Sequence, residues 1–228
     1  MKHHRTTDYK SEFLSFDFDT NPSWRIFKIM AEFVDGFAFL SKYKKTVSFY
    51  GSARFDETNH HYHEAQELAR LLAREKITII TGGGPGIMEA ANRGAVEGKG
   101  GSVGLNIELH TEQRINPYVK ESLAFDHFFT RKVMLSFAAE AYIFFPGGFG
   151  TLDEFFEIVT LVQTKKIKKV PIILIGMDYW SSLLDWITEM VYKRHSAVDE
   201  IDLTIYKLVQ NADEAYGIIK NTVIDSRE

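Results

Sequence analysis

The sequence of 228 residues contains no cysteine, only five prolines and no long hydrophobic run, and each absence excludes a class of protein or site. Without cysteine there is no disulfide framework, no cysteine-based zinc site and no thiol nucleophile. The absence of thiols is compatible with a reducing compartment. The apolar stretch at residues 170–175 has the length of a strand, whereas a membrane span needs about 20 residues.

The sequence also lacks an excess of charge of one sign, since 27 Lys and Arg stand against 31 Asp and Glu. A nucleic-acid polymer or an anionic membrane would require a basic surface, so we expect neither as a partner. The polar N-terminus is not followed by the apolar core of a signal peptide, and we therefore expect a cytoplasmic protein. With 45% hydrophobic and 25% charged residues, the composition is that of a globular chain.

Residues 22–40 carry apolar side chains at helical spacing, which predicts an amphipathic helix ahead of the main domain. We divide the chain into an N-terminal extension, residues 1–44, and a nucleotide-binding catalytic domain, residues 45–228. In the second part, strand-like and helix-like segments alternate. The expected strands are residues 46–50, 77–81, 102–105, 123–128, 141–145 and 170–175, and the expected helices are residues 61–74, 87–97, 131–139, 151–164, 180–192 and 212–221. This alternation predicts an α/β fold, a Rossmann-like doubly wound parallel sheet in a single domain with helices on both faces.

Glycine clusters follow three of the predicted strands, at residues 51–52, 81–86 and 146–151. The carboxyl ends of parallel strands share one edge of the sheet, where ligands bind in such folds. Glycine lets backbone N–H groups approach an anion, and the next helix contributes its positive end. Glycine also serves tight turns between strand and helix, which would explain one loop. The clustering on one edge favours a phosphorylated ligand.

Several common sites are absent from the sequence. A dinucleotide fingerprint would need glycine where Ile87 or Glu89 stands, and no Walker A motif occurs, so a monophosphate fits the loops better. No G-x-S-x-G motif supports serine hydrolysis. The spacing of His60, His61 and His63 matches no standard zinc pattern, and we expect solvated histidines, no metal and no cofactor.

Thr151 and Glu154 open the helix predicted after the last glycine loop, and two interpretations remain open. Threonine at an N-cap with glutamate three residues later is a capping box. Alternatively, the carboxylate of Glu154 lies one turn from Gly150, beside a phosphate-sized site, where it could act on C1′ of a ribose.

Arg131 and Lys132 fall in the first turn of the helix predicted at residues 131–139, where two cations oppose the helix dipole. An anionic ligand in the same cleft would offset this unfavourable position. The alternatives are pairing with Asp126 or a solvated surface position.

Three segments together resemble the LONELY GUY (LOG) family. Residues 146–154, P-G-G-F-G-T-L-D-E, match its P-G-G-x-G-T-x-x-E signature, and Arg131-Lys132, fifteen residues before Pro146, match its R-K pair. Residues 81–87 are similar to its glycine-rich loop. The resemblance covers residues 45–192 and points to the longer-chain branch of the family. Some relatives carry a lysine decarboxylase label, but the sequence contains no pyridoxal-phosphate signal.

The resemblance implies that a nucleoside 5′-monophosphate, AMP or a cytokinin nucleotide, is cut into free base and ribose 5-phosphate. Arg131 and Glu154 would then be catalytic. Residues that would bind the substrate by resemblance are Glu112, Lys132, Gly147, Gly148, Gly150, Thr151 and Thr160, and the earlier glycine loops add Gly51, Ser52, Gly83 and Gly84. The family further implies a homodimer or larger assembly, with the site near a subunit interface and without a metal.

In the resulting hypothesis, Glu154 stabilises an oxocarbenium-like transition state and orients water, while Arg131 orients the substrate and keeps Glu154 ionised. The competing class is a non-catalytic carrier of a nucleotide or of the molybdenum cofactor on the same fold. Binding alone explains the arginine but not a carboxylate beside a phosphate, so the pair favours the enzyme.

Overall fold

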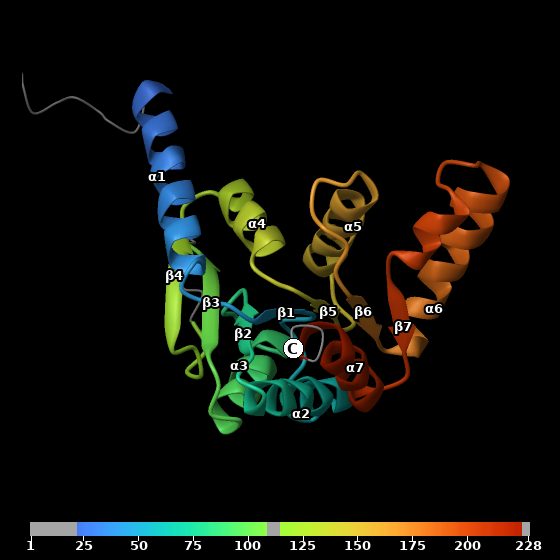
Figure 1. Cartoon of the computed structure of the whole chain (residues 1–228), viewed down its shortest axis with the longest axis horizontal. Coiled ribbons are helices and arrows are strands. Elements are labelled where there is room, and N and C mark those ends of the chain that lie inside the picture. The colour runs from blue at the N-terminus through green and yellow to red at the C-terminus, as the bar shows by residue number, and fades with distance from the viewer. Residues whose placement is uncertain (1–21, 109–114, 225–228) are drawn as a thin grey trace, which may run out of the picture.

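A computed structural model describes residues 22–108 and 115–224 of the chain. They form a seven-stranded, all-parallel sheet in the order β4-β3-β2-β1-β5-β6-β7 (Figure 1). The strands are β1 (Thr46–Tyr50), β2 (Thr78–Thr81), β3 (Ser102–Ile107), β4 (Glu121–Phe125), β5 (Tyr142–Phe144), β6 (Ile172–Ile175) and β7 (Lys207–Val209). The predicted α/β fold with a doubly wound parallel sheet is confirmed.

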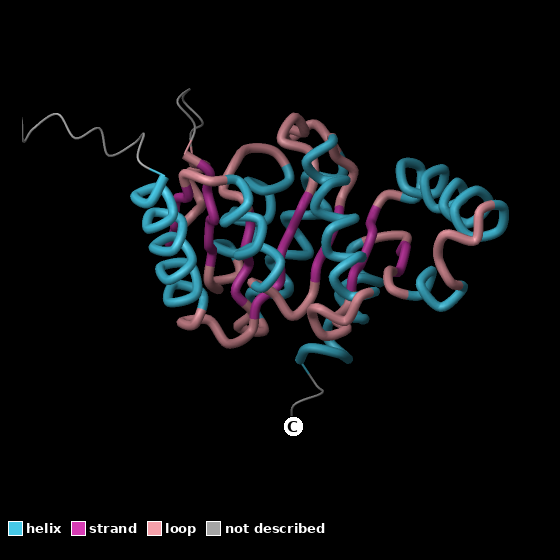
Figure 2. The backbone as a smooth tube through the Cα atoms, turned by 90° about the horizontal axis from the view of Figure 1, so that it is seen from above, coloured by secondary structure: helices cyan, strands magenta, loops and turns pink. Residues whose placement is uncertain are grey.

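Helices cover both faces of this sheet (Figures 1 and 2). The helices of one face are α2 (His60–Arg74), α3 (Ile87–Glu97) and α7 (Ala212–Ile219), and those of the other are α1 (Pro22–Leu40), α4 (Phe128–Phe137) and α5 (Phe149–Gln163). Beyond β6, α6 (Met177–Trp186) continues into the π-helix η1 (Ile187–Arg194), followed by the 3-10 helix η2 (Glu200–Thr204), while α7 continues into η3 (Lys220–Ile224). Within the two described ranges, no helix is long and apolar enough to cross a membrane.

The central strands are buried on both faces, because side chains of successive residues point to opposite layers. In β1, all five residues are buried; Phe49 belongs to the core beneath α2 and α3, whereas Tyr50 belongs to the core beneath α4 and α5. Ile79 and Ile80 of β2 divide between the two cores in the same way. This explains why the strands read as continuous apolar runs in the sequence.

Two helices on the α4–α5 side begin earlier than predicted, which changes the position of the candidate site residues. The N-cap of α4 is His127, and Arg131 N donates to His127 O, so Arg131 and Lys132 lie in the second turn. The N-cap of α5 is Gly148, which places Thr151 inside the helix. Two interpretations of the sequence were therefore wrong. Thr151 and Glu154 do not form a capping box, and Arg131 and Lys132 do not oppose the helix dipole from the first turn.

The strand β7 was missed because it is three residues long, begins with an exposed lysine and lies at the edge of the sheet. Such a short segment carries too few residues to show a periodic pattern. The other predicted elements are present with bounds shifted by a few residues. The strand β3 extends two residues beyond its prediction, to Ile107, where it pairs with Phe125 of β4.

The helix α1 is fixed to the α/β domain by a polar contact and a close backbone approach. Glu32 accepts hydrogen bonds from Asp126 N at 3.0 Å, His127 Nδ1 at 2.9 Å and Thr130 Oγ1. At Gly36, a Cβ would collide with Met134 of α4, so glycine allows the two helices to approach. These contacts hold one face of α1 against α4.

Candidate active site

Three loops at the carboxyl edge of the sheet are hydrogen-bonded to one another, since β2, β1 and β5 are neighbours. Ser52 N donates to Pro146 O at 2.9 Å, and Ile87 N donates to Ser52 O at 3.0 Å. Gly86 has a φ of +73°, and a Cβ there would collide with the backbone of Ser52. The tight packing of the first two loops therefore accounts for Gly86, as the turn interpretation of the glycines requires.

A cleft of about 810 Å³ opens above these loops. It lies where the strand order reverses between β1 and β5, the position at which doubly wound sheets bind ligands. Eight of the predicted site residues line it: Gly51, Ser52, Arg131, Gly147, Gly148, Gly150, Thr151 and Glu154. The structure thus brings both predicted catalytic residues and the last glycine loop to one cavity.

The start of α5 faces this cleft with free space around it. No side chain in the described ranges caps Gly148, and the first turn carries no acidic residue. A Cβ at Gly148 or Gly150 would meet no described atom within 4 Å. Packing among the described residues therefore does not explain these two glycines. The first N–H groups of a helix have no acceptor within it, so this 15-residue helix presents donors and a positive dipole end to an anion.

Glu154 lies in the second turn of α5, buried at the wall of the cleft. Burial, and then the neighbouring carboxylate of Glu157, raise its pKa to about 7, while Arg131 and Lys132 oppose this increase. Its Oε2 atom has no hydrogen-bond partner among the described residues. A buried carboxyl that titrates near neutral pH is suited to proton transfer.

Arg131 reaches the cleft from the second turn of α4. Its Nε donates to Leu105 O at 2.8 Å, which fixes the guanidinium at the end of β3. The guanidinium lies over Gly82, where a Cβ would collide with it. Burial lowers the pKa of Arg131, whereas the charges of Glu154 and Tyr50 raise it. Arginine remains protonated under all these influences, so a fixed cation stands near the carboxyl of Glu154.

Lys132 joins α4 to α5 and does not line the cleft. Its Nζ lies 2.7 Å from Asp153 Oδ2 and 3.2 Å from Glu157 Oε2. Its partners are thus carboxylates of α5 rather than Asp126, the partner considered from the sequence. The role of Lys132 as a direct substrate ligand stays a prediction.

Four other predicted binding residues lie outside the cleft or outside the described residues. Gly83 and Gly84 are buried beneath the second loop, where Asn116 donates to both of their carbonyl oxygens at 2.9 Å. Thr160 is exposed on α5, and its hydroxyl donates to Phe156 O. Glu112 lies outside the described residues. Their substrate contacts stay predictions.

The cleft also contains residues that the sequence interpretation missed, among them Tyr50, Arg54 and Tyr179. Tyr179 Oη donates to Gly147 O at 2.7 Å and so supports the last glycine loop. Arg54 follows Gly51-Ser52 directly, and its guanidinium makes no hydrogen bond or ion pair with any described residue. That adjacency was the available signal, because a cation in a loop at this edge of the sheet is placed to meet an anion.

The histidines at the start of α2 are not all solvated, contrary to expectation. His61 is buried, stacks with Phe55 and lies 2.9 Å from Glu64 Oε2 through Nδ1. His60, His61 and Glu64 place three possible metal-ligand atoms within 4.8 Å of one another. Packing and the His61–Glu64 hydrogen bond account for the buried ring, and the expectation of no metal stays a prediction.

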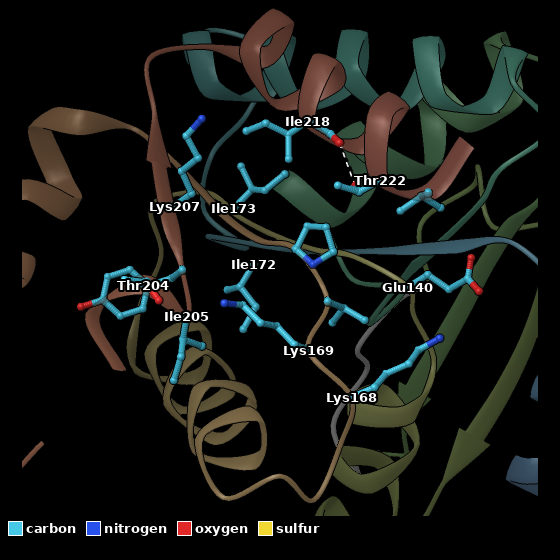
Figure 3. A pocket seen from close by; sticks show the side chains of 14 residues that line it. Glu140, Lys168, Lys169, Ile172, Ile173, Thr204, Ile205, Lys207, Ile218 and Thr222 are labelled. Carbon is cyan, nitrogen blue, oxygen red and sulfur yellow. Dashed lines mark hydrogen bonds between the residues drawn. The ribbon is translucent and has the colours of Figure 1, made fainter. Parts of the chain in front are cut away.

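A second cavity, of about 500 Å³, lies at the opposite edge of the sheet, where β6 and β7 begin (Figure 3). Its inner wall is apolar and includes Ile172, Ile173 and Ile205. Figure 3 shows Lys168 and Lys169 at its side, pointing in different directions. Because the lysines do not converge and none of the lining residues is a glycine, the cleft at the carboxyl edge is the candidate active site.

The chain is similar to known proteins in sequence and in fold. The family model described as "Possible lysine decarboxylase" matches residues 88–219. The chain is 31% identical to the "Probable cytokinin riboside 5'-monophosphate phosphoribohydrolase LOGL3" of Oryza sativa subsp. japonica, over 66% of this chain and 72% of the relative. It is 27% identical to the "Cytokinin riboside 5'-monophosphate phosphoribohydrolase LOG2" of Arabidopsis thaliana, over 79% and 83% of the two chains.

Among solved structures, the molybdenum cofactor carrier protein from Chlamydomonas reinhardtii matches with a TM-score of 0.60 and 20% identity, over 78% of this chain and 98% of that protein. At this identity, the likeness supports the fold alone.

Proposed function

This chain belongs to the LOG family, also described as lysine decarboxylase-like, and we propose that it hydrolyses the N-glycosidic bond of a nucleoside 5′-monophosphate. The products are the free base and ribose 5-phosphate, with AMP or a cytokinin riboside monophosphate as substrate. One observation carries the proposal: Glu154, a buried carboxyl with a pKa of about 7, stands one turn after a helix start that opens with glycine and that no described side chain caps. The names of the curated relatives support it.

The start of α5 binds the 5′-phosphate in this proposal. The N–H groups after Gly148 donate to the phosphate oxygens, and the absence of side-chain atoms at Gly148 and Gly150 leaves room for them. Arg54, on the opposite loop, adds a cation to the phosphate. Binding energy from the phosphate holds the ribose near Glu154, although the phosphate takes no part in bond cleavage.

The reaction breaks the bond between C1′ and the base nitrogen, whose electron pair leaves with the base. The ribose becomes oxocarbenium-like, and the oxygen of a water molecule forms the new bond to C1′. In its ionised form, Glu154 takes a proton from the attacking water, and the departing base takes up a proton from solvent; a pKa near 7 lets Glu154 return the proton it gained to solvent. Arg131 orients the substrate and favours the ionised form of Glu154 that stabilises the cation.

We further propose that the protein acts as a homo-oligomer, as the resemblance implies, and without a metal or organic cofactor. Hydrolysis by one carboxyl group and one arginine requires neither.

The decisive experiment measures free adenine after purified protein is incubated with AMP, alongside the Glu154→Gln variant. We expect adenine and ribose 5-phosphate in equal amounts, and a loss of about 10²-fold or more in kcat for the variant. Glu189→Gln, which changes a surface glutamate paired with Lys193, is the matched control and should retain full activity.

Adenosine, which lacks the phosphate, should be cleaved poorly. Binding of AMP without release of adenine would instead identify a carrier and contradict the proposal, as would full activity in a folded Glu154→Gln variant.

A further inference from the structure

The carboxylate of Glu32, in the middle of α1, lies at the N-terminus of α4. Its Oε1 atom accepts hydrogen bonds from Asp126 N at 3.0 Å and from His127 Nδ1 at 2.9 Å. Its Oε2 atom accepts one from the hydroxyl of Thr130, which is fully buried. The side chains of Glu32 and His127 are only 13% and 17% exposed. Three donors at the start of one helix therefore converge on a single, largely buried carboxylate of another.

This carboxylate gives the start of α4 an anion that the helix lacks in its own sequence. Among the described residues, the N-cap His127 makes no side-chain hydrogen bond to the first turn, and that turn contains no acidic residue. The positive dipole end of a helix favours a nearby negative charge. Burial raises the pKa of Glu32, but the hydrogen bonds from its three donors lower it below the ordinary value, so the group is ionised at neutral pH.

Packing along the whole length of α4 holds Glu32 in this position. One turn after Glu32, a Cβ at Gly36 would collide with Met134 of α4. At the end of α4, the ring of Phe137 meets that of Phe37 edge to face, with centroids 6.1 Å apart. The two helices therefore run side by side in the same direction (Figure 1). Glu32 can leave the start of α4 only if these contacts also change.

The turn of α4 that Glu32 holds leads directly to Arg131. Thr130, whose hydroxyl binds Glu32, precedes Arg131 in the chain. Arg131 N donates to His127 O at 3.3 Å, and at the other end of the residue Nε donates to Leu105 O at 2.8 Å. Arg131 is thus fixed at its backbone through the start of α4 and at its guanidinium through β3. Loss of the first anchor would move the guanidinium relative to the cleft.

We propose that Glu32 is a positioning residue for Arg131, so that α1 serves the reaction although none of its described side chains lines the cleft. This inference rests on the proposed function, in which Arg131 orients the substrate. In that proposal the phosphate binds at the start of α5, whereas Glu32 acts on α4. A change at Glu32 is therefore expected to lower kcat and to leave KM almost unchanged.

The first test is the steady-state kinetics of AMP cleavage by the full-length protein. We expect Glu32→Ala to lower kcat about 10-fold, because a small displacement of a substrate-orienting group is costly, and to change KM by less than about 2-fold. Asp35→Ala is the matched control, since it removes an exposed carboxylate from the same helix and should leave both constants unchanged. Circular dichroism and the Tm verify that the variants fold. Glu32→Gln keeps one acceptor oxygen and should show a smaller loss of kcat, which preserves the test if alanine unfolds the protein.

A double-mutant cycle identifies the residue through which Glu32 acts. If Glu32 positions Arg131, Glu32→Ala should lower kcat no further once Arg131→Ala has removed the guanidinium. If Glu32 only attaches α1 to the domain, its loss should lower kcat about 10-fold in both backgrounds. Such additive losses would overturn the inference, and so would full activity of a folded Glu32→Ala variant.

Hydrogen exchange of the free protein tests the same contact without the reaction. In Glu32→Ala, the amides of residues 131–135 should exchange about 10-fold faster than in the wild type, whereas those of α5 should not change. Equal exchange of α4 in both proteins would overturn the inference even if kcat falls. A wild type that releases no adenine would contradict the proposed function itself, and faster exchange of α4 would then still assign Glu32 to the placement of Arg131.

Discussion

Lys132 of α4 and Asp153 of α5 form an ion pair, with 2.7 Å between Nζ and Oδ2, and each is the sequence neighbour of a proposed catalytic residue. Arg131 precedes the lysine, and Glu154 follows the aspartate. The ion pair therefore links the two helices at the point where they present Arg131 and Glu154 to the cleft. We expect Lys132 to act as a positioning residue.

Replacing Lys132 by methionine should shift the acidic limb of the pH profile of kcat/KM to higher pH. The lysine lowers the pKa of Glu154 and also neutralises Asp153 and Glu157, whose charges raise it. Without the cation, a smaller fraction of Glu154 is ionised at pH 7, and we expect kcat/KM there to fall by about 10-fold. Initial rates with AMP from pH 5.5 to 9 measure this. Lys132→Arg should keep the wild-type profile. If Lys132→Met lowers the rate equally at every pH, the effect on Glu154 is refuted.

Glu154→Gln should stabilise the protein at alkaline pH while it abolishes activity. The pKa of Glu154 rises from 4.5 to about 7 on folding, so the folded state binds its proton more tightly than the unfolded chain. The ionised group therefore opposes folding: its cost is absent below pH 4.5 and grows as the pH rises toward 7. At pH 8.5 the cost is roughly 3 kcal/mol.

Urea unfolding of both proteins at pH 5 and pH 8.5 measures this difference. We expect the free energies of unfolding to be similar at pH 5 and to favour the glutamine variant at pH 8.5. A gap of equal size at both pH values would contradict the raised pKa of Glu154.

Gly150→Ala should make the protein more stable but weaken substrate binding. Its Cβ would meet no described atom within 4 Å, so the alanine fits the free protein and improves helix propensity by about 0.5–1 kcal/mol. With the phosphate bound at the start of α5, the same methyl group occupies the ligand space, and KM for AMP should rise about 10-fold.

Gly217→Ala is the control, because a Cβ on α7 is equally free. It should raise the Tm and leave KM unchanged. An unchanged KM for Gly150→Ala would contradict the proposal that the phosphate binds at the start of α5.

Arg54→Ala should raise KM for AMP with little change in kcat. Arg54 lines the cleft from the first loop. No described residue accepts a hydrogen bond from its guanidinium, which is therefore available to the phosphate. The expected increase is about 10-fold at low salt and smaller at high salt, because the interaction is electrostatic. Cleavage of adenosine serves as the internal control and should not respond to the substitution. An equal loss of kcat/KM for AMP and for adenosine would instead indicate that Arg54 contacts the base or the ribose.

The local composition of the chain was sufficient to predict the sheet and the edge that carries the site. Strand-length apolar runs followed by glycine, such as residues 46–52, mark the carboxyl ends of strands. The strand order runs outward from β1 to β4 on one side of the sheet and from β5 to β7 on the other. The loops that follow the neighbouring strands β1 and β5 therefore meet at the switch point of the sheet.

Residues whose position depends on tertiary contacts could not be predicted in this way. The start of α5 at Gly148 has no side-chain cap among the described residues, so no polar residue marks it in the sequence. α4 begins at Phe128 next to Glu32, which lies 96 positions earlier in the chain. Lys132 pairs with carboxylates on the next helix and not with Asp126, the partner considered from the sequence. Such pairings are set by helix packing and leave no local pattern.

The hydrogen bonds from Ser52 to Pro146 and from Ile87 to Ser52 join the three loops into one floor of the cleft. No one loop can move to fit a larger or smaller base without breaking a bond to its neighbour. Adaptation to a different base must therefore come from exchanging side chains on the walls, such as Phe55, Met88 or Tyr179, while the phosphate end stays constant. Members of the family that share this floor are then expected to differ in the base they accept and to agree in the phosphate they require.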